Sequence, residues 1–113
     1  MADCLFCKIA AKELDADIVY ETDDLVAFRD INPMAPTHIL VIPRRHIDSA
    51  SDLGASDGEL LGEIFETIAK LASQSGIPGG HRIVTNVGPD AGQSVGHLHF
   101  HLIGGRGMSW PPG

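Results

Sequence analysis

The residues best suited to chemistry lie in one stretch, His97-Leu98-His99-Phe100-His101-Leu102-Ile103. Three histidines alternate with apolar residues, so we expect a β-strand with the imidazoles on one face and the apolar side chains on the other. Same-face neighbours on a strand are roughly 6.5–7 Å apart. One phosphate group could touch more than one ring, and a metal could bind two of them. The pattern therefore predicts a functional polar pocket rather than a solvated strand face or a purification tag.

The central histidine, His99, is the candidate nucleophile. Neutral imidazole attacks phosphorus well, and its pKa of about 6.5 makes it a good leaving group afterwards. The attacking nitrogen must be unprotonated, so we expect a backbone carbonyl to accept from the other ring nitrogen. A catalytic zinc held by all three histidines is the competing chemistry. The outer two rings would lie roughly 13–14 Å apart on a strand, too far to share one ion.

Cys4-Leu5-Phe6-Cys7 is a C-x-x-C pair. A structural disulfide is not expected in a reducing cytosol, which leaves half a zinc site or a redox pair. Redox pairs usually open a helix after a buried strand, and no strand is predicted before Cys4. We therefore favour zinc. His46 and one end of the histidine stretch are candidates for the two missing ligands.

The elements that position these residues can be read from periodicity. We expect a short helix over 5–13, and strands over 17–22 and 25–30 joined as a hairpin. Two prolines make 32–36 a loop. His38 then opens a strand over 38–42 that is apolar on both faces and so central in the sheet.

One long helix and one further strand complete the scaffold. Ser56-Asp57-Gly58-Glu59 resembles a capping box that opens the helix, and Gly76 followed by Pro78 ends it. The expected buried stripe is Leu60, Leu61, Ile64, Phe65, Ile68, Leu71 and Ala72. A strand over 82–87 brings Asn86 near its end. The glycine-bearing loop 88–96 could present backbone N–H groups to an anion, and His81 is expected in a solvated loop.

Composition limits the function classes. The 113 residues fit one domain, 1–113, with a tail from about 106 to 113. The net charge of −7 argues against nucleic-acid polymers and anionic membranes as partners, although a small phosphate ligand could bind the histidine cluster. No apolar run is long enough to span a membrane, and the N-terminus lacks the pattern of a signal peptide. We therefore expect a cytoplasmic protein. The fold class is α+β, with an antiparallel sheet of about five strands, one long helix and one short helix.

The motif His-x-His-x-His followed by two apolar residues is that of the histidine-triad (HIT) family. The flanking residues, Gly92-Gln93-Ser94-Val95 before it and Gly104-Gly105-Arg106 with Trp110-Pro111-Pro112-Gly113 after it, resemble the Hint branch of nucleoside phosphoramidases. Asp30-Ile31, Ala35-Pro36-Thr37-His38 and Val41-Ile42-Pro43 match that branch as well. The resemblance covers nearly the whole chain and implies a HIT-like fold.

The resemblance also implies an activity. It is hydrolysis of the P–N bond of purine nucleoside 5′-phosphoramidates, of the adenosine 5′-monophosphoramidate type, through a nucleotidyl-histidine intermediate. One alternative is hydrolysis or nucleotidyl transfer on dinucleoside polyphosphates, as in other branches. Another is a zinc-stabilised nucleotide-binding module without significant turnover. The expected partner is a purine nucleotide of the AMP or GMP type.

The family's residue roles carry over onto matching positions. The catalytic set is His99, His101, His38 and His97, with His38 and His101 donating to phosphate oxygens. The implied nucleotide-binding residues are Asp30 for the ribose, Phe6, Ile9, Phe28 and Ile31 for the base, and Asn86, Gly92, Gln93, Ser94 and Val95 around the phosphate. From sequence alone, Asp30 also fits a turn, and the four apolar residues also fit a core.

Two further features follow from the resemblance. Zinc-bearing relatives point to Cys4, Cys7, His46 and His97 as ligands of a structural zinc. The family also implies a homodimer in which the sheets join across the two-fold axis and each tail approaches the partner's active site. A small core and the tail tryptophan, Trp110, which is costly to leave in water, agree with such a dimer.

Overall fold

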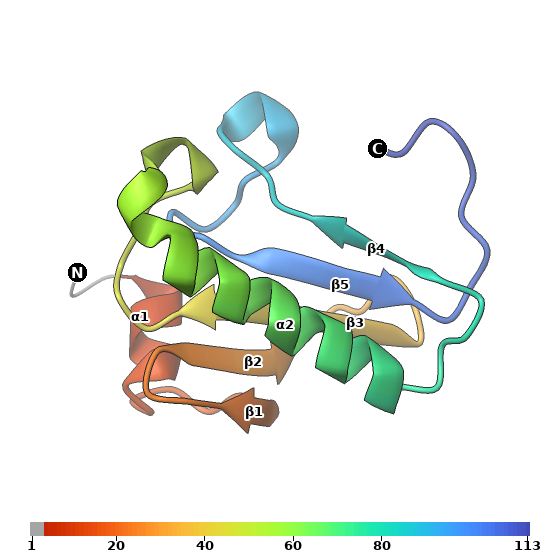
Figure 1. Cartoon of the computed structure of the whole chain (residues 1–113), viewed down its shortest axis with the longest axis horizontal. Helices are drawn as coiled ribbons and strands as arrows, with labels where there is room; N and C mark the ends of the chain where they lie inside the picture. Colours follow the sequence, from red (N-terminus) through yellow and green to blue (C-terminus); the bar gives the residue numbers. More distant parts are fainter. Residues whose placement is uncertain (1–3) are drawn as a thin grey trace.

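The computed structural model describes residues 4–113 and contains one five-stranded antiparallel sheet with the strand order β1-β2-β3-β5-β4 (Figure 1). The strands are β1 (Ile18–Glu21), β2 (Leu25–Arg29), β3 (Thr37–Pro43), β4 (His81–Val84) and β5 (Phe100–Gly104). The helices are α1 (Leu5–Ala10) and α2 (Gly58–Gln74), with three short 3-10 turns in the connections. The predicted α+β class is confirmed. The interpretation that no leader peptide begins the chain rests on residues 1–3, which lie outside the described residues.

The predicted hairpin and the central strand are confirmed. β1 and β2 pair antiparallel, and β3 lies between β2 and β5 with every residue buried. The predicted strand over 82–87 is shorter, because β4 runs from His81 to Val84. His81 was expected in a loop and instead opens this strand, although its side chain is exposed.

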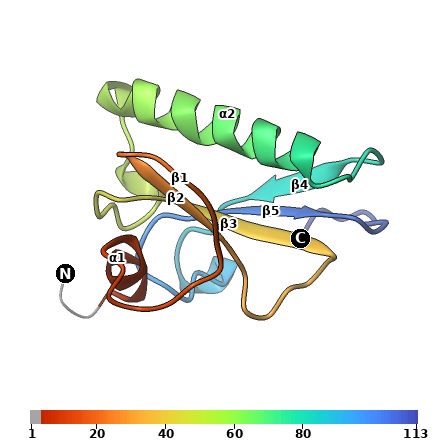
Figure 2. The same cartoon turned by 90° about the horizontal axis from the view of Figure 1, so that it is seen from below.

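Each face of the sheet packs against one helix, as Figure 2 shows with α2 on one side and α1 on the other. Alternation sorts the strand residues between two apolar clusters. Odd-numbered β2 and β3 residues and even-numbered β5 residues pack toward α2, whereas even-numbered β2 and β3 residues pack toward α1. The α2 cluster includes Leu25, Ala27, Ile39, Val41, Phe100 and Leu102. The α1 cluster includes Val26, Phe28, Leu40, Ile42, Phe6 and Ile9.

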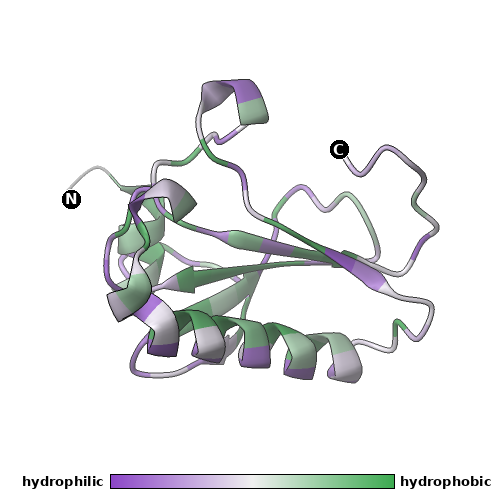
Figure 3. Cartoon of the chain, turned by 45° about the horizontal axis from the view of Figure 1, so that its top comes forward, coloured by the Kyte–Doolittle hydropathy of each residue, from purple (hydrophilic) through white to green (hydrophobic). Residues whose placement is uncertain are grey.

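The long helix is confirmed, but two details of its prediction are wrong. Ser56 does not cap it: Asp57 precedes the first helical residue and its carboxylate accepts from the Gly54 N–H at 2.9 Å, which closes a 3-10 turn instead. Phe65 is 47% exposed because it lies at the edge of the apolar stripe. Figure 3 shows the hydrophilic side of α2 turned away from the sheet. Ile64 and Ile68 are fully buried, and each such side chain stabilises the fold by about 1.5–3 kcal/mol.

The short helix ends earlier than predicted, at Ala10 rather than near residue 13. Lys12 follows in a left-handed conformation, with φ 61°, and so breaks the helical path. The Lys8 carbonyl accepts from the Glu13 N–H at 2.8 Å, which closes the end of this helix. The helix is long enough to place Phe6 and Ile9 on the sheet and to present both cysteines at its N-terminal end.

The strand that carries the histidines begins at Phe100, not at His97 as predicted. The antiparallel register pairs Val41 with Phe100, so Leu98 would pair with Pro43. Proline has no N–H, so the ladder cannot continue there. The Leu98 N–H instead donates to the Ile47 carbonyl at 2.6 Å. Residues 97–99 therefore follow the loop after β3, although Leu98, Phe100 and Leu102 still share the α2 face.

The tail was expected to dock its tryptophan, and within one chain it does not. Trp110 is 84% exposed, while Arg82 holds the tail by donating to the Ser109 and Pro112 carbonyls. Among the described residues, no helix combines the length and the apolar character needed to cross a bilayer.

Candidate functional site

The histidines of the motif lie on the α1 face of the sheet. Leu98, Phe100 and Leu102 belong to the cluster under α2, so the intervening residues point the other way. In β3, His38 shares the parity of Leu40, which packs toward α1. Leu40 pairs directly with His101 in the register, so His38 and His101 are diagonal neighbours on one face. The pairing of β3 with β5 thus brings His38 onto the same face as the three histidines of the motif, which are far from it in sequence.

The imidazole face, for which we predicted a polar pocket, is largely covered in the structure. His97 has no exposed surface and His99 is 5% exposed. The Phe6 ring covers both, with ring centroids 6.0 Å from His97 and 5.0 Å from His99 in edge-to-face geometry. A buried imidazole needs a partner for each polar atom, and no buried side-chain nitrogen or oxygen among the described residues lacks one.

Four residues form a cluster able to hold a metal, and they are the four expected from the sequence. Cys4 Sγ lies 3.3 Å from His97 Nδ1, and Cys7 Sγ lies 3.2 Å from His46 Nδ1 and 3.5 Å from His97 Nδ1. All four ligand atoms lie within 4.8 Å of one another. Two thiols and two imidazoles are a donor set typical of structural zinc.

The partners of the two imidazoles fit a metal at that point. The Nε2–H of His97 donates to the Pro43 carbonyl at 2.8 Å, which leaves Nδ1 with a lone pair toward the thiols. The Nε2–H of His46 donates to an Asp48 carboxylate oxygen at 2.6 Å, which likewise leaves the His46 Nδ1 with a lone pair toward Cys7. Such outer partners fix the ring that ligates a metal. Burial and the neighbouring Cys4 raise the pKa of the Cys7 thiol, a cost that a bound cation would remove.

His99 uses the opposite ring nitrogen. Its Nδ1–H donates to the His97 carbonyl at 2.7 Å, so the lone pair is on Nε2. This carbonyl is the acceptor that the sequence argument required. The Thr85 hydroxyl donates to the His99 carbonyl at 2.9 Å and fixes the main chain at the same residue. His99 therefore offers an oriented, unprotonated nitrogen suited to nucleophilic attack.

His38 and His101 form a directed pair, with His38 Nε2 2.9 Å from His101 Nδ1. The Met34 N–H donates to His38 Nδ1 at 3.1 Å, so the proton of neutral His38 is on Nε2 and points to His101. His101 then carries its own proton on Nε2. An Asp30 carboxylate oxygen also lies 3.4 Å from His38 Nε2. These three groups are close enough for a metal. A protonated Nε2 on His38 favours a hydrogen-bonded chain instead.

Burial keeps these rings neutral. It lowers the pKa of His38 and of His97 below the usual range, although Asp30 opposes the shift at His38. At His101, burial together with the nearby His99 and His38 lowers the pKa to about 4. Neutral rings have one donor and one acceptor each, so the hydrogen-bond directions given for His38, His97 and His101 hold at neutral pH.

The loop before the motif contains the residues expected around a phosphate, and two of them have other partners. Gln93 Nε2 donates to the Asp48 and Val95 carbonyls, and its Oε1 accepts from the Gly88 N–H. Asn86 Nδ2 donates to the Ala91 carbonyl at 2.8 Å. Both amides therefore brace the loop. Ser94 is exposed, and Gly92 adopts φ 82°, a conformation that favours glycine and ends the 3-10 turn Pro89–Ala91.

Three of the four residues expected around a base lie together. Phe6, Ile9 and Phe28 belong to the cluster under α1, and Val95 packs against it. All three are buried, at most 7% exposed, so they also fill the core. Ile31 is 91% exposed and does not join them. Asp30 lies at the end of β2, where Oδ1 accepts from the Asn32 N–H at 2.8 Å while Oδ2 faces His38, so it is both a turn residue and part of the site.

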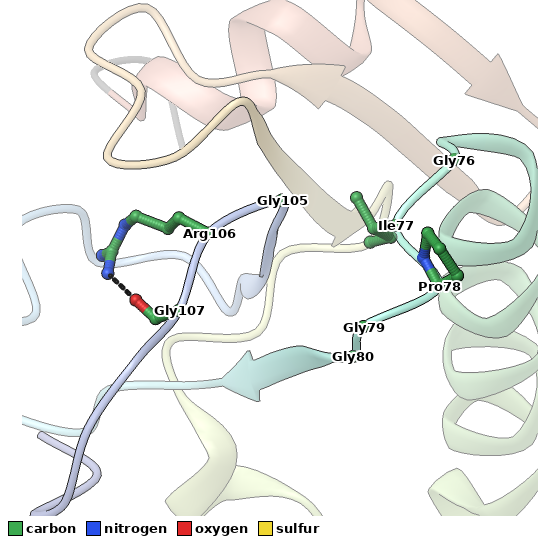
Figure 4. A pocket seen from close by; sticks show the side chains of 8 residues that line it. All are labelled: Gly76, Ile77, Pro78, Gly79, Gly80, Gly105, Arg106 and Gly107. Atoms are coloured by element: carbon green, nitrogen blue, oxygen red, sulfur yellow. Dashed lines mark hydrogen bonds between the residues drawn. The ribbon is translucent and has the colours of Figure 1, made fainter.

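Sequence reasoning missed three groups that set the chemistry. Asp48 follows His46 by two residues, and that His-x-Asp spacing could have signalled an outer partner for a ligand. The Pro43 carbonyl and the Met34 N–H belong to the backbone and leave no signal in residue types. The hollow drawn in Figure 4, between residues 76–80 and 105–107, contains none of the predicted site residues.

Comparison with known proteins agrees with this geometry. The model of the HIT domain family matches residues 11–108. A 14 kDa zinc-binding protein of Zea mays is 46% identical over 112 residues, covering 96% of this chain and 87% of its own. The crystal structure of a HIT family hydrolase from Legionella pneumophila superposes with a TM-score of 0.96 at 50% identity, covering 98% of this chain and all of that one. A histidine triad nucleotide-binding protein from Candida albicans gives a TM-score of 0.79 at 31% identity, with 98% and 85% covered.

Proposed function

The chain belongs to the HIT domain family, and from that premise we propose that it hydrolyses the P–N bond of purine nucleoside 5′-phosphoramidates. The observation that carries the proposal is the 2.7 Å bond from His99 Nδ1 to the His97 carbonyl. It leaves Nε2 as a nucleophile in a buried site beside the His38–His101 pair. The Legionella relative, which is named a hydrolase, supports a hydrolytic rather than a purely binding role.

The reaction has two steps. In the first, the lone pair of His99 Nε2 attacks the α-phosphorus, a bond forms between that nitrogen and phosphorus, and the bond to the substrate nitrogen breaks. The amine takes up a proton from solvent as it leaves. In the second, water attacks the same phosphorus, the bond to Nε2 breaks, and the nucleoside monophosphate is released with a proton given up by the water. His99 returns to its starting form.

His101 is the group that meets the phosphate. Because its Nδ1 accepts from His38, its Nε2–H is free to donate to a phosphate oxygen and to stabilise the charge that develops there. His38 acts through His101 rather than on the phosphate directly. The Ser94 hydroxyl, exposed at the loop, is our candidate donor to the leaving nitrogen. Asp30 supplies carboxylate oxygens for the ribose hydroxyls.

The apolar residues near the histidines fit the base. The rings of Phe6 and Phe28 lie 5.5 Å apart, Phe6 lies 5.0 Å from His99, and Ile9 and Val95 belong to the same part of the core. A purine placed against them would be held by apolar contact, with Ile31 able to cover it from the exposed side. This arrangement favours a planar base without selecting one purine.

We further propose that the four-residue cluster holds a structural zinc. The Zea mays relative is named a zinc-binding protein, and the donor set fits. When bound, the ion would tie the start of α1 to the segment that carries His97. Thiolate ligands need reduced cysteines, which agrees with the cytoplasmic location expected from the sequence. In this proposal the imidazoles carry out the reaction at phosphorus, and the zinc takes no part in it.

We also propose a homodimer. The apolar surface left by one chain includes Phe65, Ile83 and Trp110, each at least 39% exposed. A partner would cover such side chains and give the tail tryptophan a contact. Sedimentation should give about twice the 12.0 kDa chain mass at micromolar concentration. A monomer there would contradict the assembly but not the reaction.

A substrate panel tests the proposed function. Adenosine 5′-phosphoramidate and AMP-morpholidate should be hydrolysed to AMP, and diadenosine tetraphosphate should be a poor substrate. The reverse preference would assign the chain to the dinucleoside polyphosphate hydrolases. If AMP bound but no compound were turned over, the chain would be a nucleotide-binding module, in agreement with the name of the Candida relative.

A further inference from the structure

We propose that Arg106 is a positioning residue for the reaction: it clamps the loop 32–36 so that the Met34 N–H sets the proton positions of His38 and His101. The inference rests on the proposed function. Neither Arg106 nor Met34 touches the reacting atoms in the proposed reaction. The family resemblance assigns no role to either residue. The connection joins the segment after β5 to the loop before β3.

The loop delivers one specific N–H. It contains Pro33 and Pro36, which have no backbone hydrogen to donate, and the Asn32 N–H is used by Asp30. Met34 and Ala35 keep the remaining N–H groups, and it is the Met34 N–H that donates to His38 Nδ1 at 3.1 Å. With that hydrogen in place, a proton on His38 Nδ1 would face another proton. His38 therefore keeps its proton on Nε2 and donates to His101.

Two independent contacts hold this loop from the far side. The Arg106 Nε–H donates to the Met34 carbonyl at 2.7 Å, so both polar backbone groups of Met34 are engaged. The other contact is packing at Gly105, which has φ 96°. A Cβ added there would lie 3.0 Å from Pro36 Cβ, so only glycine permits this approach. Figure 4 shows Arg106 beside Gly105 with its guanidinium bonded to the Gly107 carbonyl, which restrains the side chain further.

The consequence reaches the phosphate through three hydrogen bonds in series. Arg106 fixes Met34, Met34 fixes the tautomer of His38, and His38 fixes that of His101. His101 then presents Nε2–H rather than a lone pair to the phosphate. A lone pair at that position would repel an anionic oxygen as charge develops on it. The clamp should therefore act on the chemical step and leave ground-state binding largely unchanged.

The test combines NMR with kinetics on the full-length protein. The ¹⁵N shifts of imidazole distinguish a protonated ring nitrogen from one with a lone pair. In the wild type at neutral pH, both His38 and His101 should carry the proton on Nε2. In Arg106→Ala, both rings should show mixed tautomers, and kcat should fall about 3- to 10-fold at nearly constant KM, as expected for one lost hydrogen bond. Arg106→Lys can still donate to one carbonyl and should recover part of the loss.

Arg82→Ala is the matched control, because Arg82 also donates to two backbone carbonyls but holds the tail, not the loop. It should leave the ring tautomers unchanged. Wild-type tautomers in Arg106→Ala would overturn the inference, as would equal tautomer changes in Arg82→Ala, which would assign the effect to the tail. The NMR signature needs no substrate. If the wild type lacked turnover on phosphoramidates while the tautomers followed Arg106, the proposed function would fail and the clamp would stand.

Discussion

His97 and His99 are two residues apart, yet they use opposite ring nitrogens. His97 donates from Nε2 to the Pro43 carbonyl and turns Nδ1 toward the thiols of Cys4 and Cys7. His99 donates from Nδ1 to the His97 carbonyl and keeps its lone pair on Nε2. The same side chain is thus suited to ligate a metal in one place and, in the proposed reaction, to act as a nucleophile in the other. The backbone carbonyl that accepts the other proton makes the difference.

The two regions also differ in what they need from the fold. The metal cluster joins α1, the loop after β3 and the start of the histidine segment, so it depends on chain segments that meet only in the folded state. The His38–His101 pair is set by the register of β3 with β5 and lies within the sheet. We therefore expect changes at the cluster to act on stability, and changes at His99 or His101 to act on turnover.

The largest effect should come from His99→Gln. Removing the nucleophile should lower turnover on a phosphoramidate by at least about 10³-fold, by comparison with other enzymes that lose their nucleophile. Zinc content and AMP affinity should stay near those of the wild type, measured by elemental analysis and calorimetry. His81→Gln, at an exposed position in β4, is the control and should remain active. A variant that lost zinc as well as turnover would contradict the proposal that the metal cluster and the reacting histidines act separately.

The next effect should come from Cys7→Ala. Loss of one thiolate should release zinc and lower the free energy of unfolding by roughly 3 kcal/mol, the scale set by a ligand that binds only the folded state. Chemical denaturation with and without a chelator measures it. Where the variant is still folded, its turnover should stay within a few-fold of the wild type. If turnover instead disappeared in folded, metal-free protein and returned only with added zinc, the ion would be part of the reaction.

A smaller effect should appear in the dependence of stability on pH. Burial, with His99 and His38 nearby, lowers the pKa of His101 to about 4, against about 6.5 for an unperturbed histidine. Between these values the unfolded chain binds a proton at this residue and the folded chain does not. Stability should therefore be fully present above pH 6.5 and fall as the pH drops toward 4.

His101→Gln removes that proton and should make the loss of stability with falling pH less steep. Denaturation midpoints at pH 7, 6 and 5 give the comparison. Part of the slope should remain in the variant, because burial lowers the pKa of His38 and His97 as well. Identical slopes for the variant and the wild type would mean that His101 titrates alike in the folded and unfolded chains.

Deleting residues 108–113 should have the smallest effect on stability, less than about 1 kcal/mol, because exposed surface contributes little. Trp110 is 84% exposed within the chain, and the carbonyls that Arg82 contacts can be replaced by water. The deletion should have a larger effect on substrate selectivity, which is measured as the ratio of the kcat/KM values for two amine leaving groups. An unchanged ratio would contradict the implied approach of each tail to the partner's active site.

The sequence predicted the fold well because its patterns are local. Strand patterning located β2, an apolar run on both faces located β3, helical spacing located α2, and the short gap between the strands predicted over 17–22 and 25–30 gave the hairpin. The start of β5 was missed because it depends on a partner, Pro43, that cannot donate to Leu98 across the sheet. Phe65 was placed in the buried stripe because spacing shows which face a residue lies on, but not where the neighbouring layer ends.

The candidate site was predicted less completely. The four members of the metal cluster are gathered as expected, since cysteine and histidine types are informative in themselves. The amide side chains of Gln93 and Asn86 were expected near a phosphate, and the sequence did not indicate the backbone carbonyls to which they donate in the structure. The groups that select the tautomers of His97, His99 and His38 are backbone atoms of Pro43, His97 and Met34. Their positions follow from tertiary packing, so residue types alone could not show them.

The most direct test of the account is to stop turnover of a radiolabelled adenosine phosphoramidate within one cycle and to map the labelled peptide. We predict an AMP group bonded to the His99 imidazole, stable in base, labile in acid, and absent from His99→Gln. The adduct should form equally in protein whose zinc has been removed by a chelator and which remains folded. A label on another residue, or no covalent label together with activity that requires added metal, would contradict the assignment of His99 as the nucleophile.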